Sequence, residues 1–244
     1  MTKTTTRKEM TEGNVKEVLI KLSWPIIFGM IIQSSFNLVD TFFLGKLGHE
    51  ALAAMSVSFP IIFITMALAG GIGVGVNSLI SRKHGARDKK GVRLVIQNAY
   101  ALIFIVYLLI VLFTFFFLES LLMKMGISEN ILRLSMEYSR MYFFGSFFLF
   151  FTFLSNNILR AKGNTKTPMK ILIIAGIINM ILDPMFIFGF GFIPSMGIQG
   201  ASFATVLSRF LASIYLIKIM FLKKNGITFK AFRFDFDIVK NILK

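Results

Sequence analysis

Two carboxylates inside apolar stretches are the residues of this sequence most suited to chemistry. Of the twelve acidic residues, only Asp40 and Asp183 lie well inside long stretches of apolar residues. An ionised carboxylate at membrane depth costs several kcal/mol, so it is paired with a cation, protonated or exposed to a polar cavity. The plain structural interpretation is an ion pair with Arg140 or Arg209. Intramembrane acids more often mark an ion or proton pathway, so we expect a functional site here.

Polar neighbours accompany each carboxylate at helical spacing. Gln33, Asn37 and Asp40 follow one another at i, i+4 and i+7. Asn179 and Asp183 follow at i and i+4. Each set therefore shares one face of a helix. Carboxylate, amide and hydroxyl oxygens are hard ligands suited to a small cation, and the carboxylates can equally hold protons.

Long apolar runs must carry these residues across a membrane. Hydrophobic residues make up 55% of the 244 residues, Phe alone contributes 29, and the mean hydropathy is +0.74. This composition is more apolar than that of a soluble domain. About 20 apolar residues cross the hydrocarbon core as a helix, and these runs lack the alternation of barrel strands. The sequence therefore predicts an all-α integral membrane protein with six transmembrane helices, at about 22–44, 52–80, 94–118, 136–159, 169–190 and 197–221.

The basic residues set the predicted orientation. Twenty-two of the 27 Lys and Arg residues lie before the first span, in the loops 81–93 and 160–170, or from Lys218 onward. By the positive-inside rule, both termini are cytoplasmic in a multi-pass protein of the cell (inner or plasma) membrane. The formal net charge of +15 is then explained without nucleic acid, and the partner expected for the basic ends is the anionic lipid bilayer.

This topology places the polar side chains at similar depths. The first and fifth spans run outward, and the sixth runs inward. At about 1.5 Å per residue, Asp40 lies roughly 6–8 Å below the outer end of its helix, and Asp183 and Thr205 lie at roughly 10–12 Å. Asn179 lies at about 16 Å. We therefore expect Asp40, Asn179, Asp183 and Thr205 to converge on one site that binds a small cation or protons. Pro184 removes a backbone donor beside Asp183, which predicts a bend and a freed carbonyl, or an ordinary proline kink.

Several other kinds of site are excluded or disfavoured. Cysteine is absent, so disulfides and thiolate metal sites are excluded. His49 and His84 are isolated, and no metalloprotease, nucleophile-elbow or nucleotide-binding motif occurs. The glycines of 70–75 lie inside an apolar run without a following Lys-Ser/Thr, which favours close helix packing. We therefore expect neither an enzyme nor a bound cofactor.

Five motifs resemble those of the multidrug and toxic compound extrusion (MATE) transporters, in the order that family shows. They are residues 39–45 (VDTFFLG), 73–81 with the following Arg82, Gly85, Ala86 and Asp88, 160–169 (RAKGNTKTPM), 179–184 (NMILDP) and 197–205 (GIQGASFAT). The resemblance covers essentially the whole chain. It implies efflux of an organic, often cationic compound in exchange for Na⁺ or protons. It also implies that Asp40, Asn179, Asp183 and Thr205 form the coupling site, and that Gln33 and Asn156 lie near the substrate cavity, with Asn37 on the same face.

The resemblance also implies a partner for this chain. The family has twelve spans in two lobes, so residues 1–244 correspond to the N-terminal six-helix lobe, with 222–244 a cytoplasmic tail leading into a second lobe. Residues 15–19 (VKEVL) are echoed by 239–243 (VKNIL), as expected for a parallel repeat. We expect the second lobe to come from a separate chain or from self-association. The alternatives are a flippase for lipids or lipid-linked oligosaccharides, whose cavity would need basic residues such as Arg140 and Arg209, and an inactive truncated lobe.

Overall fold

The computed structural model describes residues 14–221 and 233–243, and this part of the chain is helical. A single isolated bridge between Phe190 and Ile193 is the one β-type pairing found within those ranges. The helices are α2 (Val15–Leu47), α3 (His49–Gly85), α4 (Lys89–Lys124), α5 (Glu129–Ala161), α6 (Lys166–Ile187), α7 (Gly197–Met220) and α8 (Phe236–Leu243).

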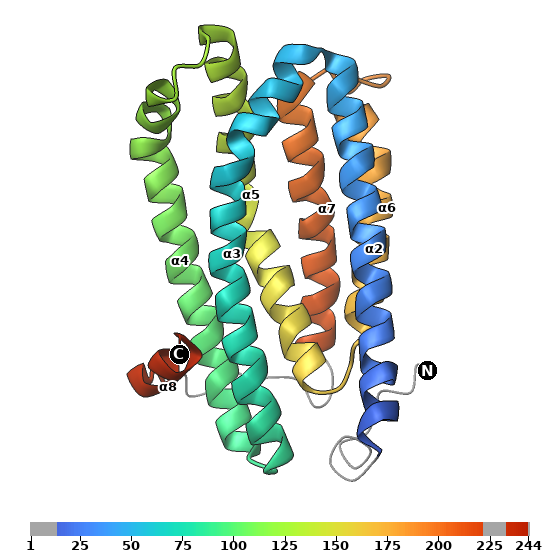
Figure 1. The fold of residues 1–244 in the computed structure, drawn as a ribbon, viewed down its shortest axis with the longest axis vertical. Helices are drawn as coiled ribbons and strands as arrows, with labels where there is room; N and C mark the ends of the chain where they lie inside the picture. The colour runs from blue at the N-terminus through green and yellow to red at the C-terminus, as the bar shows by residue number, and fades with distance from the viewer. Residues whose placement is uncertain (1–13, 222–232, 244) are drawn as a thin grey trace.

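Six long helices form an antiparallel bundle, as the sequence predicts (Figure 1). Helices α3 to α7 are each long and apolar enough to cross a membrane. The shortest of them, α6, has 22 residues and so measures about 33 Å, slightly more than a hydrocarbon core of about 30 Å. Helix α2 is not one of those five, but its 33 residues contain the predicted first span and extend from one end of the bundle to the other.

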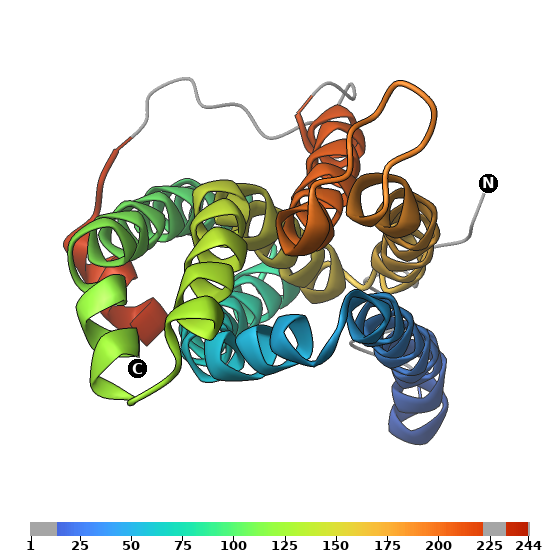
Figure 2. The same ribbon diagram turned by 90° about the horizontal axis from the view of Figure 1, so that it is seen from above.

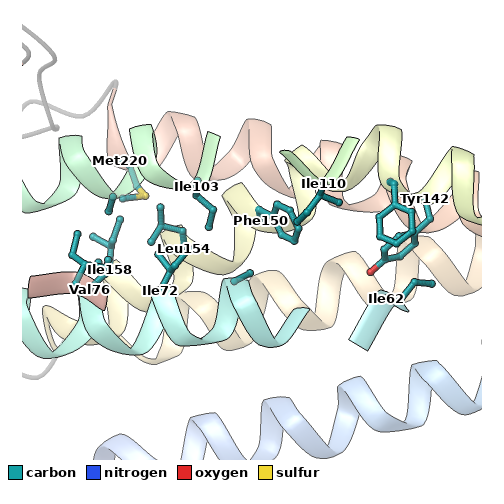
Figure 3. Close-up of a cluster of buried hydrophobic side chains, with 14 of the residues drawn as sticks. Ile62, Ile72, Val76, Ile103, Ile110, Tyr142, Phe150, Leu154, Ile158 and Met220 are labelled. Atoms are coloured by element: carbon teal, nitrogen blue, oxygen red, sulfur yellow. The ribbon is translucent and has the colours of Figure 1, made fainter. Parts of the chain in front are cut away.

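Helix α5 is the centre of the bundle, with α3, α4 and α7 packed around it (Figure 2). Serine hydroxyls join α3 to α5 near both ends. Ser135 Oγ donates to the carbonyl of Ala54 at 3.3 Å, and Ser81 Oγ donates to the carbonyl of Ala161 at 3.4 Å. Small residues let two membrane helices approach closely, because association in lipid depends on packing and hydrogen bonds. Buried side chains such as Ile72, Leu154 and Ile158 fill the space between them (Figure 3).

Helices α2 and α6 form a second pair beside this core, and α7 connects the pair to α5. Gly176 of α6 faces the Phe36 ring of α2, and a methyl group on Gly176 would overlap that ring. At its far end α6 stops at Ile187, three residues before the predicted span ends. Ser195 Oγ donates to the Ile187 carbonyl at 2.9 Å, so the loop returns directly to α7.

The short connections follow the turn chemistry of the sequence. Asp88 caps α4 by accepting a hydrogen bond from the Gly91 backbone N–H at 2.7 Å, and it pairs with Lys83 at 3.3 Å. The Gly91 N–H first, and Lys83 second, hold the pKa of Asp88 below its usual value. Gly163, with φ of +78°, ends the α5 turn in the left-handed region that glycine favours.

The predicted tail 222–244 lies partly outside the described residues, which resume at Arg233. Within the described part, the predicted amphipathic piece forms α8, which folds back onto α3 and α4. Val239 and Ile242 are buried by this contact. The C-terminal helix and the start of α2 lie at the same end of the bundle, together with the 81–93 and 160–170 loops (Figure 1).

The orientation can be tested by cysteine labelling, because the chain has no native cysteine. Lys89 and Lys166 begin α4 and α6 at the basic end, whereas Lys124 and Ser195 lie at the opposite end. Single cysteines at Lys89 and Lys166 are expected to stay unlabelled by a membrane-impermeant maleimide in intact cells, and those at Lys124 and Ser195 to react. The reverse pattern would invert the topology.

The contact between α2 and α6 gives a stability prediction. Gly176→Ala is expected to lower the free energy of unfolding by about 1–2 kcal/mol, because the new methyl group overlaps Phe36. Gly70→Ala is the matched control, since a methyl group there meets nothing within 4 Å and alanine is the better helix former. Denaturant unfolding in detergent micelles measures both, and Phe36→Ala should restore part of the loss. Equal effects at both glycines would contradict the proposed overlap.

Candidate functional site

Helices α6 and α7 bring three of the predicted site residues together. Asn179 Nδ2 donates to Asp183 Oδ1 at 2.9 Å, as the i, i+4 spacing on α6 predicts. The same amide nitrogen lies 3.5 Å from Thr205 Oγ1 on α7. Asp183 is only 1% exposed, whereas Asn179 and Thr205 are half-buried. The amide therefore orients one oxygen of a buried carboxylate and connects it to the neighbouring helix.

Pro184 follows this carboxylate inside α6. Proline has no backbone N–H, so the Met180 carbonyl lacks its usual i+4 donor. The helix nevertheless continues to Ile187, and the Phe188 N–H donates to the Pro184 carbonyl at 3.1 Å. The Met180 carbonyl, about one turn before Asp183, therefore receives no backbone hydrogen bond from position 184.

Asp40 supplies the second carboxylate from α2. It is half-buried, and its charge lies close enough to Asp183 for the two to repel one another. Asp40 Oδ1 and Asp183 Oδ2 are both buried, and neither has a hydrogen-bond partner among the described residues. One oxygen of each carboxylate is therefore available to a cation or a proton.

The two arginines proposed as structural partners bind elsewhere. Arg140 pairs with Glu119 of α4 at 3.1 Å, with both side chains more than half exposed. Arg209 donates to Gln33 Oε1 of α2 at 3.0 Å. Neither arginine forms an ion pair with Asp40 or Asp183 within the described ranges. The interpretation of these carboxylates as half of a structural ion pair is therefore not supported.

Gln33 and Asn37 form a second polar group on α2. Gln33 Nε2 donates to Asn37 Oδ1 at 3.1 Å, and Gln33 in turn accepts from Arg209. Gln33 lies seven positions before Asp40, so this group is about 10 Å along α2 from the carboxylate. Asn156 is different: it lies on α5, is 4% exposed, and has a buried Oδ1 with no partner in the described part of the chain. No hydrogen bond there connects Asn156 to Gln33 or Asn37.

Sequence reasoning missed Tyr138 on α5. Its side chain is 5% exposed, and it lies close enough to Asp40 and Asp183 for both charges to act on it. Its ring stacks on Tyr142, with centroids 6.3 Å apart. A signal was available, because two tyrosines at i, i+4 stand out in a chain with 29 Phe and only five Tyr. The link from Arg209 to Gln33 was also missed.

The arrangement offers oxygen ligands from three helices around two like charges. No group of three or more His, Cys, Asp or Glu side chains that could hold a metal ion occurs among the described residues. Transition metals favour nitrogen and sulfur ligands, whereas carboxylate, amide and hydroxyl oxygens suit hard cations. The chemistry available here is reversible binding of a small hard cation or of protons.

Comparison with known proteins is consistent with this geometry. The MatE family model matches residues 25–185. The chain is 35% identical over 206 residues to the FAD transporter of Shewanella oneidensis, covering 84% of this chain and 46% of that protein. It is 33% identical to the probable multidrug resistance protein YoeA of Bacillus subtilis, covering 82% of this chain and 43% of that protein.

Solved structures of transporters also match this chain. The outward-facing conformation of a multidrug resistance MATE family transporter of the MOP superfamily superposes with a TM-score of 0.90 at 34% identity. The match covers 99% of this chain and 53% of that one. A MOP superfamily transporter from Pyrococcus furiosus, described by the reverse polarity of its binding pocket, gives the same TM-score and identity. The chain therefore spans about half the length of the relatives it matches and belongs to the MATE family of secondary transporters, as one six-helix lobe.

Proposed function

We propose that this chain is the N-terminal lobe, residues 1–244, of a transporter that exports an organic, often cationic compound in exchange for Na⁺ or protons. The observation that carries the proposal is the pair Asp40 and Asp183, each with a buried oxygen that no described residue satisfies. Relatives with names that refer to multidrug resistance or export, such as YoeA and the MepA protein of Staphylococcus aureus, support efflux.

The coupling site is proposed to consist of Asp40, Asn179, Asp183 and Thr205. Two neighbouring carboxylates in a poorly solvated site cannot both remain charged without a counterion, because their repulsion adds to the cost of desolvation. A bound Na⁺, or one or two protons, removes that repulsion. Asn179 holds Asp183 Oδ1 and leaves Oδ2 for the ion. Binding the ion would therefore draw α2 toward α6 and α7, and its release would let them separate.

Substrate binding is proposed at Gln33 and Asn37, with Arg209 now added to this group and Asn156 a less directly supported member. A second candidate substrate class, an anionic compound, is favoured by Arg209, which lies on the polar face and donates to Gln33. The FAD transporter of Shewanella oneidensis is a relative whose named substrate is anionic. A lipid-linked oligosaccharide flippase is less well supported, because Arg140 is exposed and paired with Glu119.

A second lobe is proposed as the partner of this chain, supplied by another polypeptide or by a second copy. Asn37 of α2 is exposed in the single lobe, so part of the polar face lacks a cover. Alternating access in transporters of this kind requires one bundle to rock against another. The placement of α8 and the start of α2 at the same end of the bundle supports the proposed cytoplasmic location of both ends in the plasma or inner membrane. The alternative is an inactive lobe, and a transport measurement distinguishes the two.

Transport by reconstituted protein tests this function. The chain alone in liposomes is expected to form no substrate gradient. Together with a second lobe taken from a close relative, it should export ethidium when an inward gradient of Na⁺ or of protons is imposed separately, and only one ion should be effective. Asp40→Asn should reduce this transport by at least about 100-fold, because the neutral amide cannot exchange a charge.

The matched control is Glu119→Gln, which removes an exposed carboxylate outside the site. Its transport rate is expected to remain within about twofold of the unmodified protein, since exposed ion pairs contribute little. Gradient-driven export that persists in Asp40→Asn would refute the assigned coupling role. Export by the lobe alone would refute the need for a partner.

A further inference from the structure

A large apolar groove runs along the outside of the bundle between α3 and α4, on a side formed by neither α2 nor α6. Its volume is about 1520 Å³, and α8 closes one end. Side chains that line it are largely exposed, including Phe63, Val74 and Leu109 at 60%, 68% and 60%. The groove is therefore separate from the polar site and open to whatever surrounds the protein.

The polar groups of the groove gather at its α8 end. Thr65 and Thr114, farther along, donate to carbonyls of their own helices at 2.7 and 2.8 Å and offer no hydroxyl proton to a ligand. Near α8 the lining includes Ser78, Arg82 and Asn241. Arg82 is exposed, and it forms no ion pair or side-chain hydrogen bond with any described residue. One end of this mostly apolar groove thus carries a cation that has no partner in the described part of the chain.

The α8 wall is held in place by specific contacts. Asn98 of α4 is fully buried; its Nδ2 donates to the Arg233 carbonyl at 3.1 Å, and its Oδ1 accepts from the Asp235 N–H at 2.8 Å. Asp235 in turn caps α8 by accepting from the Ile238 N–H at 3.2 Å. The Ile242 carbonyl lies against Gly75, where no side chain would fit. Hydrogen bonds and close packing therefore fix α8 at the end of the groove.

The groove follows α3 from Arg82 to Ile61, or about 31 Å, and its half nearest α8 matches one leaflet of a bilayer. Arg82 lies at the basic end of the bundle, and Gly71 lies eleven residues away on the same helix, or about 16 Å. This is about half of a hydrocarbon core of about 30 Å. An anionic group bound to Arg82 would thus stand at the membrane surface, with its hydrocarbon chain reaching Gly71.

We propose that this groove is a binding site for an anionic phospholipid of the inner leaflet. The lipid phosphate pairs with Arg82, and an acyl chain follows the groove past Val74 toward Gly71. Charge complementarity selects a lipid over an apolar protein helix, because a helix would bury Arg82 without an anion, and unpaired buried charges are costly. The site is independent of ion coupling at Asp40.

Lipid retention by the purified chain tests the site. In native mass spectrometry from detergent, the unmodified chain is expected to retain phosphatidylglycerol in preference to phosphatidylcholine with the same acyl chains. Arg82→Gln should reduce this preference about fivefold, the factor equivalent to about 1 kcal/mol for one basic residue at an anionic surface. Arg87→Gln is the control, because Arg87 lies at the same end of α3 but does not line the groove.

A second pair of variants tests the acyl chain. A Cβ at Gly70 or Gly71 meets nothing within 4 Å, so a side chain can begin at either position, and of the two only Gly71 lines the groove. Gly71→Trp should reduce retention of both lipids, and Gly70→Trp should not. A photo-crosslinking residue at Val74 in cell membranes should form lipid adducts. Equal retention of the two lipids, equal effects within either pair of variants, or a crosslink to a polypeptide would overturn the proposal.

Discussion

The cost of placing two carboxylates within reach of each other's charge in an apolar bundle is the constraint on which the rest of this structure depends. Asp40 and Asp183 repel one another, and no described arginine or lysine neutralises them. A lobe that keeps such a pair must hold it in a geometry where an ion or a proton relieves the repulsion. Asn179, Thr205 and Tyr138 lie around this pair.

Close helix packing makes that geometry specific. The absence of a side chain at Gly176 lets the Phe36 ring lie against α6, which brings α2 and its Asp40 next to Asp183. Gly200 serves the same purpose between α6 and α7, because a Cβ there would overlap the backbone of Phe186. In lipid, where no hydrophobic effect drives helices together, such close approaches supply much of the specificity of association. The proposed coupling site thus lies among α2, α6 and α7, which approach one another closely at these glycines.

Much of this could be read from the sequence because it depends on local periodicity. Apolar runs of sufficient length predict membrane helices, and the i, i+4 spacing of Asn179 and Asp183 predicts their contact on one face. The contact between Arg209 and Gln33 joins residues 176 positions apart, and no local pattern reports it. The docking of α8 through Asn98 is similar, since that contact also depends on how distant segments pack. The end of α6 at Ile187 also differs from the prediction, because the chain turns at Gly189 and Gly191, both with positive φ, inside a run that is apolar enough to be read as helix.

Whether Asp40 and Asp183 act as one site can be measured directly by a double-mutant cycle of ion binding. Binding of Na⁺ and of protons to the purified protein would be followed by calorimetry for the unmodified chain, Asp40→Asn, Asp183→Asn and the double variant. If the two carboxylates share one ion, each single substitution removes most of the binding free energy and the double substitution removes little more. Additive losses, with measurable binding left in each single variant, would mean two separate sites and would contradict the account.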